Sequence, residues 1–460
     1  MQYHQADLLP APNIALGNHR IIMAPGVFEH EAQAMQQTLD SKSILGRPMI
    51  SLVVFLFFFR GFCTVLVDSL IPQLRAIYEL SYTQAMFTQF CFYFGYLFFS
   101  VPAACLLSRL GYMRAIVSGL AVMMTGCLLF SPAASLGVYE AFLASLFVLA
   151  AGITLLQVTT NPLVAALGSA RSSYSRLTLA QAFNSMGTTI APLVGAWLIL
   201  KPIAHPAGMP TAISGADRLL RAHALQVPFL AVACVLAALA LVFWLNRGQP
   251  VPALRTGPLN SSFGFRLLRN RRFLLGVISI FLYVGAEVSI GSVMINYLTQ
   301  SSVLAVATPH AGALASLYWG GAMCGRFLGS AALRFVPAGK ALSVCSLIAG
   351  ALALTSSYTG GTIAAATIIA IGLFNSIMFP TIFALALEGL GADKPEGSGM
   401  LCMAIVGGAI VPLLTGLAAD SRGLAFSLLV PAACYMWIAF YGNYMGRRAK
   451  LPADMVADSR

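Results

Sequence analysis

The stretch SLVVFLFFFRGFCTVLVDSLIPQL, residues 51–74, decides the fold class. It is apolar almost throughout and is long enough for the roughly 20 residues that a helix needs to cross a hydrocarbon core about 30 Å thick. It carries two charges, Arg60 and Asp68. Similar segments recur along a chain of 460 residues that is 58% hydrophobic and 9% charged, with a mean hydropathy of +0.82. This composition excludes a soluble globular protein and predicts a membrane protein.

A scan on that length scale gives about twelve candidate membrane-spanning helices. They are expected to begin near Pro48, Gln84, Met113, Gly137, Leu177, Ala222, Phe273, Ala311, Ala341, Thr362, Gly397 and Leu424. Barrel strands are the poorer interpretation, because the apolar runs are too long and do not alternate apolar with polar residues. The sequence therefore predicts an all-α membrane protein, whose helices satisfy their own backbone hydrogen bonds.

Cations concentrate in alternate loops of this predicted topology. They gather between the second and third segments, at Arg109 and Arg114, in the stretch 247–272 and beyond the last segment, at 447–460. This positive-inside pattern predicts a multi-pass protein of the bacterial inner membrane with both termini in the cytoplasm. The net charge of +12 then reflects orientation and contact with anionic lipids, and no nucleic-acid partner is expected.

The chain is expected to divide into two similar halves. Pro162 recurs as Pro380, and Pro192 as Pro412, at an offset of about 220 residues. Repeated halves with helix breakers are typical of secondary transporters, whose site lies near the membrane midplane between the halves. The predicted parts are a polar, disordered cytoplasmic tail (1–47), a six-helix bundle (48–246), a basic cytoplasmic linker (247–272), a second six-helix bundle (273–446) and a cytoplasmic tail (447–460).

Ionisable residues inside the predicted spans are candidate functional groups. A charge at such depth costs at least about 2.5–3.5 kcal/mol on insertion scales, so it must face a partner or water. Asp68 in the first half corresponds to Glu287 in the second half at the same offset of about 220 residues. These two carboxylates are the proton-coupling candidates. For Arg60 two interpretations stay open: a structural pair with Asp68 or a carbonyl, or the binding of an anionic substrate group.

Amide side chains cluster near the predicted helix breaks and suit a neutral, hydroxyl-rich ligand, because an amide both donates and accepts hydrogen bonds. Singly, each amide is more often a contact between helices. The substrate-binding candidates are Gln89, Gln157, Asn161, Gln181, Asn184 and Asn375, together with Arg60 and Glu287. Aromatic faces for a sugar ring are available at Tyr93, Phe183, Tyr283, Tyr318 and Trp319.

No catalytic site, metal site or cofactor is expected. The nine cysteines occur singly, without CxxC spacing, and no nucleophile stands in a GxSxG turn. The sequence therefore does not predict an enzyme, and the lack of a repeated pore loop disfavours a channel. A transporter-derived sugar sensor remains an alternative.

Long motifs identify a family. The sequence resembles the major facilitator superfamily and, within it, the bacterial fucose and glucose/galactose sugar:proton symporters. The resemblance rests on DSLIPQL (68–74), FYFGYLFFSVPAACLLSRLGYMRAI (92–116), NPLVAALG (161–168), RLTLAQAFNSMGTTIAPLVGAWL (176–198), YVGAEVSIGSVMINYL (283–298), GRFLGS (325–330) and NSIMFPTIFALALEGLG (375–391).

The resemblance implies twelve transmembrane helices in two six-helix bundles related by a pseudo-two-fold axis. It implies import of a glucose- or galactose-like hexose with a proton, by a monomer. Fucose, N-acetylglucosamine or an acidic sugar as substrate, sodium as the ion, and facilitated transport are the alternatives.

The resemblance also assigns roles to single residues. It implies that Asp68 is the acid of the first helix tied to proton coupling, and that Gln157 stands where the fucose type has a glutamate that contacts sugar and couples to protons. An amide cannot titrate, so coupling through Asp68 alone, coupling through Glu287 and facilitated transport all stay open. Arg60 replaces the family's usual aromatic residue, and Val67 its usual asparagine.

The segment SRLGYMR, residues 108–114, resembles the superfamily's cytoplasmic gating motif. The resemblance implies a gating role for Arg109 and Arg114, which would cap a helix end and pair across the bundle. Simple positive-inside anchoring is the alternative.

Overall fold

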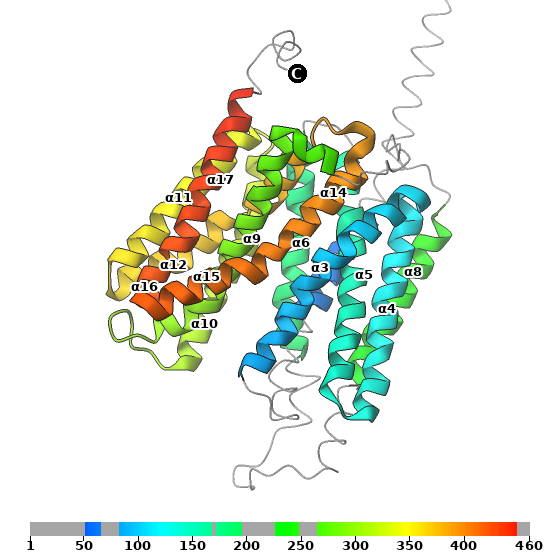
Figure 1. Cartoon of the computed structure of the whole chain (residues 1–460), viewed down its shortest axis with the longest axis horizontal. Helices are drawn as coiled ribbons and strands as arrows, with labels where there is room; N and C mark the ends of the chain where they lie inside the picture. The colour runs from blue at the N-terminus through cyan, green and yellow to red at the C-terminus, as the bar shows by residue number, and fades with distance from the viewer. Residues whose placement is uncertain (1–50, 66–81, 168–171, 196–225, 248–264, 449–460) are drawn as a thin grey trace, which may run out of the picture. The chain divides into compact units, whose positions relative to one another are not determined.

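The computed structural model describes residues 51–65, 82–167, 172–195, 226–247 and 265–448, and every structural statement below concerns these residues (Figure 1). All of them belong to one compact unit, Ile50–Arg460. Asp68 lies outside the described residues, and so does the side chain of Gln89.

The described chain is helical, with short turns between helices (Figure 1). The first half, residues 51–247, contains helix Ser51–Val65, α3 (Tyr82–Leu110), α4 (Tyr112–Leu136), α5 (Tyr139–Ala166), α6 (Ser173–Gly195) and α8 (Gln226–Leu245). The second half, residues 265–448, contains η4 (Phe265–Arg269), α9 (Arg271–Leu298), α10 (Thr308–Ala332), α11 (Ala338–Tyr358), α12 (Gly361–Asn375), α13 (Met378–Leu387), η5 (Gly391–Asp393), α14 (Lys394–Met403), η6 (Ala404–Val406), α15 (Gly407–Arg422), α16 (Leu424–Ser427) and α17 (Leu429–Arg448).

Ten of the twelve expected helix starts lie within four residues of the start of an observed helical segment, and the other two, Pro48 and Ala222, lie outside the described residues. The segment expected near Phe273 begins at Arg271, and the last one begins at Leu424 as expected. Within the described residues nine spans are long and apolar enough to cross a membrane. The prediction of an all-α membrane protein is therefore confirmed.

Helices α6 and α10 are long enough to span a membrane but are too polar to be counted among the nine. Their packing explains this polarity, because the two helices contact each other across the boundary between the halves. The Phe183 and Phe327 rings meet edge-on there, with centroids 5.8 Å apart. A face that packs on another helix need not be as apolar as one that meets lipid.

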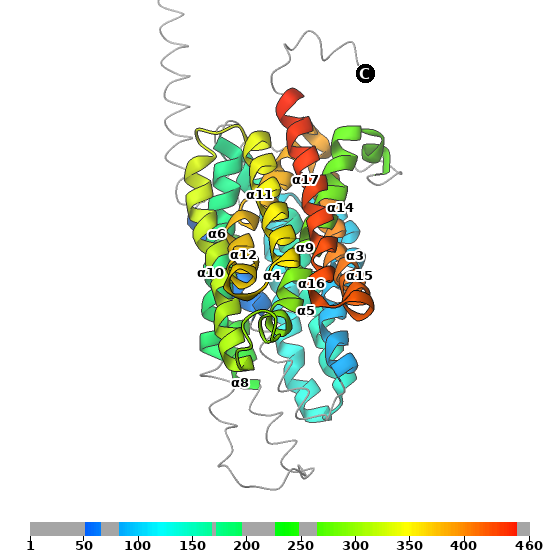
Figure 2. The same cartoon turned by 90° about the vertical axis from the view of Figure 1, so that its left-hand side faces the viewer.

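Each half has its own packing. In the first half, α4 packs on α5 and α8, and α3 packs on α5. In the second half, α10, α12, α11 and α17 follow one another in contact, as Figure 2 shows, and α9 packs on α15 and α17. Between the halves, α14 contacts α3 and α5, and α13 contacts α6. The predicted bundle and linker boundaries stay a prediction.

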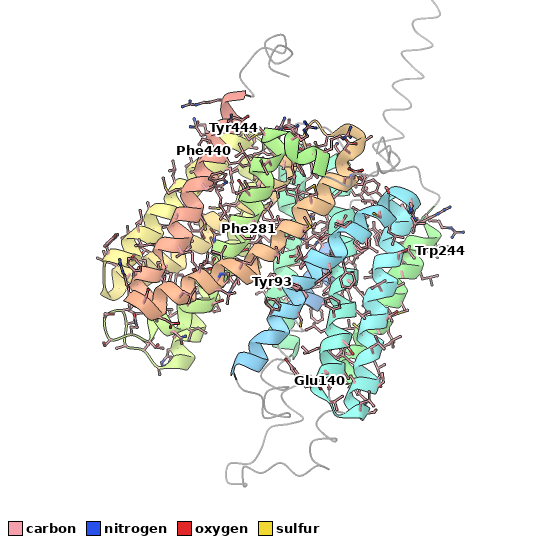
Figure 3. All side chains as sticks on the ribbon, in the orientation of Figure 1. Tyr93, Glu140, Trp244, Phe281, Phe440 and Tyr444 are labelled. Atoms are coloured by element: carbon pink, nitrogen blue, oxygen red, sulfur yellow. The ribbon has the colours of Figure 1, made fainter. Side chains whose placement is uncertain are left out.

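Among the described residues, arginines gather at one end of the helices. At one end lie Arg109, Arg272, Arg334 and Arg447, where α3, α10 and α17 end and α9 begins; we call it the arginine-rich end. Figure 3 shows Trp244 and Tyr444 toward this end and Glu140, in the first turn of α5, at the opposite end.

Helix Ser51–Val65 crosses α6 at two glycines. A Cβ atom on Gly61 would overlap the Asn184 carbonyl, and one on Gly187 would overlap the Phe58 carbonyl. Only glycine allows the backbones to approach this closely, as in other small-residue contacts between membrane helices. The Asn184 side chain donates a 2.9 Å hydrogen bond to the Phe57 carbonyl at the same crossing.

Candidate functional site

The predicted amides of the first half lie close together on α5 and α6. The Tyr96 hydroxyl of α3 donates to Oε1 of Gln157 at 3.3 Å, and Nε2 of Gln181 donates to Oδ1 of Asn161 at 3.4 Å. Gln157 is 7% exposed and Asn161 is fully buried. Asn184 is on the same helix as Gln181, but its amide nitrogen is used at the crossing with helix Ser51–Val65.

The polar residues of the second half form one connected network. The Tyr283 hydroxyl donates to Oε1 of Glu287 at 2.8 Å and also lies 3.1 Å from the Asn375 carbonyl. Nδ2 of Asn375 donates to the Tyr318 hydroxyl at 2.8 Å. This network joins α9, α10 and α12 and brings Glu287 and Asn375 together, and their role in binding sugar stays a prediction.

Arg326 of α10 completes this network. Its Nη2 lies 3.8 Å from Oε1 of Glu287, and its Nε donates to the Ser376 carbonyl at 3.3 Å. Its Nη1 donates to the hydroxyl of Ser185 on α6, in the other half. Arg326 therefore links the carboxylate of one half to a side chain of the other.

Two prolines supply acceptors for these contacts. A proline has no N–H, so the carbonyl four residues earlier in a helix loses its helical donor. Pro380 in this way frees the carbonyl of Ser376, which lies between the end of α12 and the start of α13. This carbonyl accepts the hydrogen bond from Arg326. Pro162 frees the carbonyl of Val158, which accepts a 2.6 Å hydrogen bond from Ser398 of α14.

Arg60 is 5% exposed, and its guanidinium stacks over the Phe57 ring at 4.8 Å. It lies close enough to Tyr96 of α3, Cys402 of α14 and Arg326 of α10 to interact electrostatically with them. Its position is thus at the boundary between the halves. Among the described residues its Nη1 has no hydrogen-bond partner.

The halves also meet at the arginine-rich end. The Ser175 hydroxyl of α6 donates to the Ser330 carbonyl of α10 at 2.7 Å, and the Ser330 hydroxyl donates back to the Ser175 carbonyl at 2.9 Å. Nearby, Arg272 forms an ion pair with Glu388. The two serine hydrogen bonds bring α6 and α10 together at this end of the molecule.

The predicted gating residues Arg109 and Arg114 are both exposed at the arginine-rich end. Neither guanidinium pairs with an acid in the described part of the chain. Their gating role stays a prediction, as do the roles of Asp68, which lies outside the described residues, and of Gln89, whose side chain does.

Sequence reasoning missed Arg326, Tyr96 and Ser185. Arg326 stood in the quoted motif GRFLGS, and an arginine within a predicted span is itself a signal of a functional group. Tyr96 and Ser185 offered no such signal, because their roles depend on which helix faces they occupy.

The described residues hold no group of three or more His, Cys, Asp or Glu side chains able to bind a metal. The nine cysteines are free thiols.

Comparison with known proteins identifies the family. The sequence profile described as Major Facilitator Superfamily matches residues 53–400. The chain belongs to this superfamily. The resemblance drawn from the motifs is thus confirmed, and with it the fold of two six-helix bundles and a multi-pass membrane location.

Similar proteins are sugar transporters by name. A glucose/galactose transporter of Brucella abortus is 47% identical over 407 residues, covering 88% of this chain and 95% of the relative. The L-fucose-proton symporter of Escherichia coli is 34% identical over 418 residues, covering 87% of this chain and 93% of the relative. A crystal structure of that fucose symporter in the outward conformation matches with a TM-score of 0.77 at 31% identity, covering 86% of this chain and 98% of the other.

Proposed function

We propose that this chain imports a glucose- or galactose-like hexose together with a proton by alternating access. The similarity to the Brucella abortus glucose/galactose transporter supports the substrate, and the similarity to the fucose-proton symporter supports the ion. The observation that carries the proposal is the meeting of two polar groups at the boundary between the halves. Gln157 and Tyr96 belong to one, and Glu287 and Arg326 to the other.

The amides provide the chemistry for a neutral sugar. Gln157, Asn161 and Asn375 can each donate to or accept from a hydroxyl group, so they can satisfy a sugar hydroxyl in either sense. Among the described residues, Nδ2 of Asn161 and Oδ1 of Asn375 have no hydrogen-bond partner. One donor in the first half and one acceptor in the second therefore remain for a ligand held between them.

Glu287 and Arg326 connect ion binding to movement of the halves. A proton on Glu287 removes its charge and weakens its attraction for Arg326, which also holds Ser185 of the first half. Asp68, for which the family resemblance implies the same chemistry, is the second proton-coupling candidate. Proton binding in this way changes a contact that must break when the halves rock.

The orientation follows from the positive-inside rule, which makes the arginine-rich end cytoplasmic. The serine pair at that end then closes the cytoplasmic side, with both chain termini in the cytoplasm, and the protein works as a monomer among anionic lipids. Arg109 and Arg114 act at this closure.

The test is uptake of radiolabelled D-glucose and D-galactose by proteoliposomes with an inward proton gradient. Accumulation should occur, should collapse with a protonophore and should not be driven by sodium alone. Asp68→Asn and Glu287→Gln separate the coupling routes: the variant at the coupling acid loses accumulation but keeps counterflow of the sugar. Binding of either hexose without counterflow would identify a sensor and contradict transport, and the absence of hexose binding would exclude the substrate class.

A further inference from the structure

The guanidinium of Arg60 is the buried charge that the proposed hexose site leaves unused. Its side chain is 5% exposed, and Nη1 has no hydrogen-bond partner within the described residues. Removing a cation from water costs several kcal/mol unless charge and hydrogen bonds compensate for it. Stacking on the Phe57 ring accounts for one face of the guanidinium but does not satisfy the Nη1 donor at its edge.

The surroundings of Arg60 favour a negative charge. Its electrostatic neighbours are the Tyr96 hydroxyl, the Cys402 thiol and a second guanidinium, that of Arg326. Arg326 is compensated by Glu287 at 3.8 Å. Among the described residues of this cluster two arginines thus face one carboxylate, which leaves one positive charge in excess. A carboxylate on a bound ligand would balance this charge.

Groups that recognise a sugar stand beside this charge. Tyr96 neighbours Arg60 and also donates to Gln157, one of the proposed sugar-binding amides. An anion held by Arg60 and a hydroxyl held by Gln157 can therefore belong to one small molecule. The planar guanidinium presents parallel N–H donors that match the two oxygens of a carboxylate.

We propose that, besides the neutral hexose, this protein carries a hexuronate, the acid formed when C6 of a hexose is a carboxylate, and that Arg60 binds this carboxylate. The inference rests on the proposed function, because it places the ring hydroxyls of the same hexose on the same amides. The neutral hexose is then a weaker ligand that lacks the partner of Arg60.

The experiment compares affinities of the full-length protein for D-glucuronate and D-galacturonate with those for D-glucose and D-galactose. Calorimetry in detergent gives binding, and counterflow in proteoliposomes gives transport. The wild-type protein should bind at least one hexuronate roughly tenfold more tightly than the matching hexose, as expected for a charge-assisted hydrogen bond. This comparison needs no variant and does not depend on how a substitution folds.

Three variants test the assignment to Arg60. Arg60→Gln should weaken hexuronate binding roughly 30-fold and hexose binding less than about threefold. Arg60→Lys, which keeps the charge without the planar fork, should retain part of the preference. Arg247→Gln is the matched control, since Arg247 also stacks on an aromatic ring, that of Trp244 at 4.0 Å, but is exposed at the end of α8; it should behave as the wild type.

The outcomes separate the two proposals. A protein that carries hexose and prefers it to both hexuronates overturns the role of Arg60 and leaves the hexose proposal standing. Equal weakening of hexose and hexuronate in Arg60→Gln also overturns it, because it indicates a structural pair. A wild-type protein that binds neither class of sugar overturns both.

Discussion

Ser398 of α14 donates its hydroxyl to the main-chain carbonyl of Val158 in α5, 2.6 Å away and in the other half of the molecule. That carbonyl is available because Pro162, four residues later, offers no N–H to it. Pro380 does the same for the Ser376 carbonyl, which accepts from Arg326. Pro162 and Pro380 thus serve as more than helix breakers, because each of these two exposes an acceptor at or beside the boundary between the halves.

Pro162→Ala should weaken the contact between the halves. Alanine restores the N–H that competes for the Val158 carbonyl, and loss of a hydrogen bond of about 1 kcal/mol shifts the equilibrium between conformations up to roughly tenfold. The readout is the alkylation rate of Cys402, a buried thiol of α14, followed by mass spectrometry. Labelling should accelerate.

Ser398→Ala should accelerate this labelling in the same way. Pro132→Ala is the control, because Pro132 lies inside α4, which packs on α5 and α8 of its own half. Unchanged labelling of Cys402 in both test variants would contradict the role given to the freed carbonyl.

Arg326 and Glu287 should behave as an energetically coupled pair. Arg326→Gln leaves Glu287 without its cation at a site where the side chain is only 14% exposed, so a loss of about 3 kcal/mol is expected. Glu287→Gln combined with Arg326→Gln should cost less than the sum of the single changes. Thermal unfolding in detergent measures all three variants, and strictly additive losses would show that the two side chains do not interact.

A disulfide across the arginine-rich end should stop transport. The hydroxyl oxygens of Ser175 and Ser330 lie 3.3 Å apart, so cysteines at both positions are close enough to bond. Oxidation of Ser175→Cys with Ser330→Cys should abolish counterflow, and a reductant should restore it.

The control for this cross-link joins two helices of one half. Ser289 of α9 and Thr415 of α15 are hydrogen-bonded at 3.0 Å, so Ser289→Cys with Thr415→Cys should bond equally well. Counterflow should survive oxidation of this pair alone, because each half is expected to move as a rigid unit. Continued transport with the Ser175–Ser330 bond formed would mean that this contact does not open.

Gly187→Ala should destabilise the protein. The added methyl group meets the Phe58 carbonyl, and the helices must separate to admit it, at a cost of about 1–3 kcal/mol. Gly320→Ala in α10 is the matched control, because nothing lies within 4 Å of its added Cβ. The melting temperature should fall for the first and stay or rise for the second; equal values would argue against close packing at Gly187.

Gln157→Ala should weaken binding of the transported sugar roughly tenfold, because it removes a hydrogen-bonding group from a nearly buried position. Tyr96→Phe, which deletes only the donor to Gln157, should have a smaller effect. Gln226→Ala removes an amide that joins α8 to α4 and should leave affinity unchanged. Unaltered affinity in Gln157→Ala would remove this residue from the site.

The fold was predictable because it depends on segment length and hydrophobicity, which the sequence displays directly. The pairing within the site was not. Arg326 can be read from the sequence as a charge within a predicted span, but its link to Ser185 depends on the rotation of two helices about their axes. The same rotation directs Asn184, expected to bind sugar, to the Phe57 carbonyl. The sequence pattern therefore identifies the polar residues but does not predict which groups they contact.

The acceptors at Val158 and Ser376 belong to the peptide backbone, and every amino acid carries that oxygen. Genetic drift at these two codons can therefore exchange the side chain without deleting the acceptor. The constraint falls instead on the codons for Pro162 and Pro380. In a collection of natural variants we expect side chains of similar volume to be tolerated at the first pair of positions, which are buried, and any substitution to be selected against at the second.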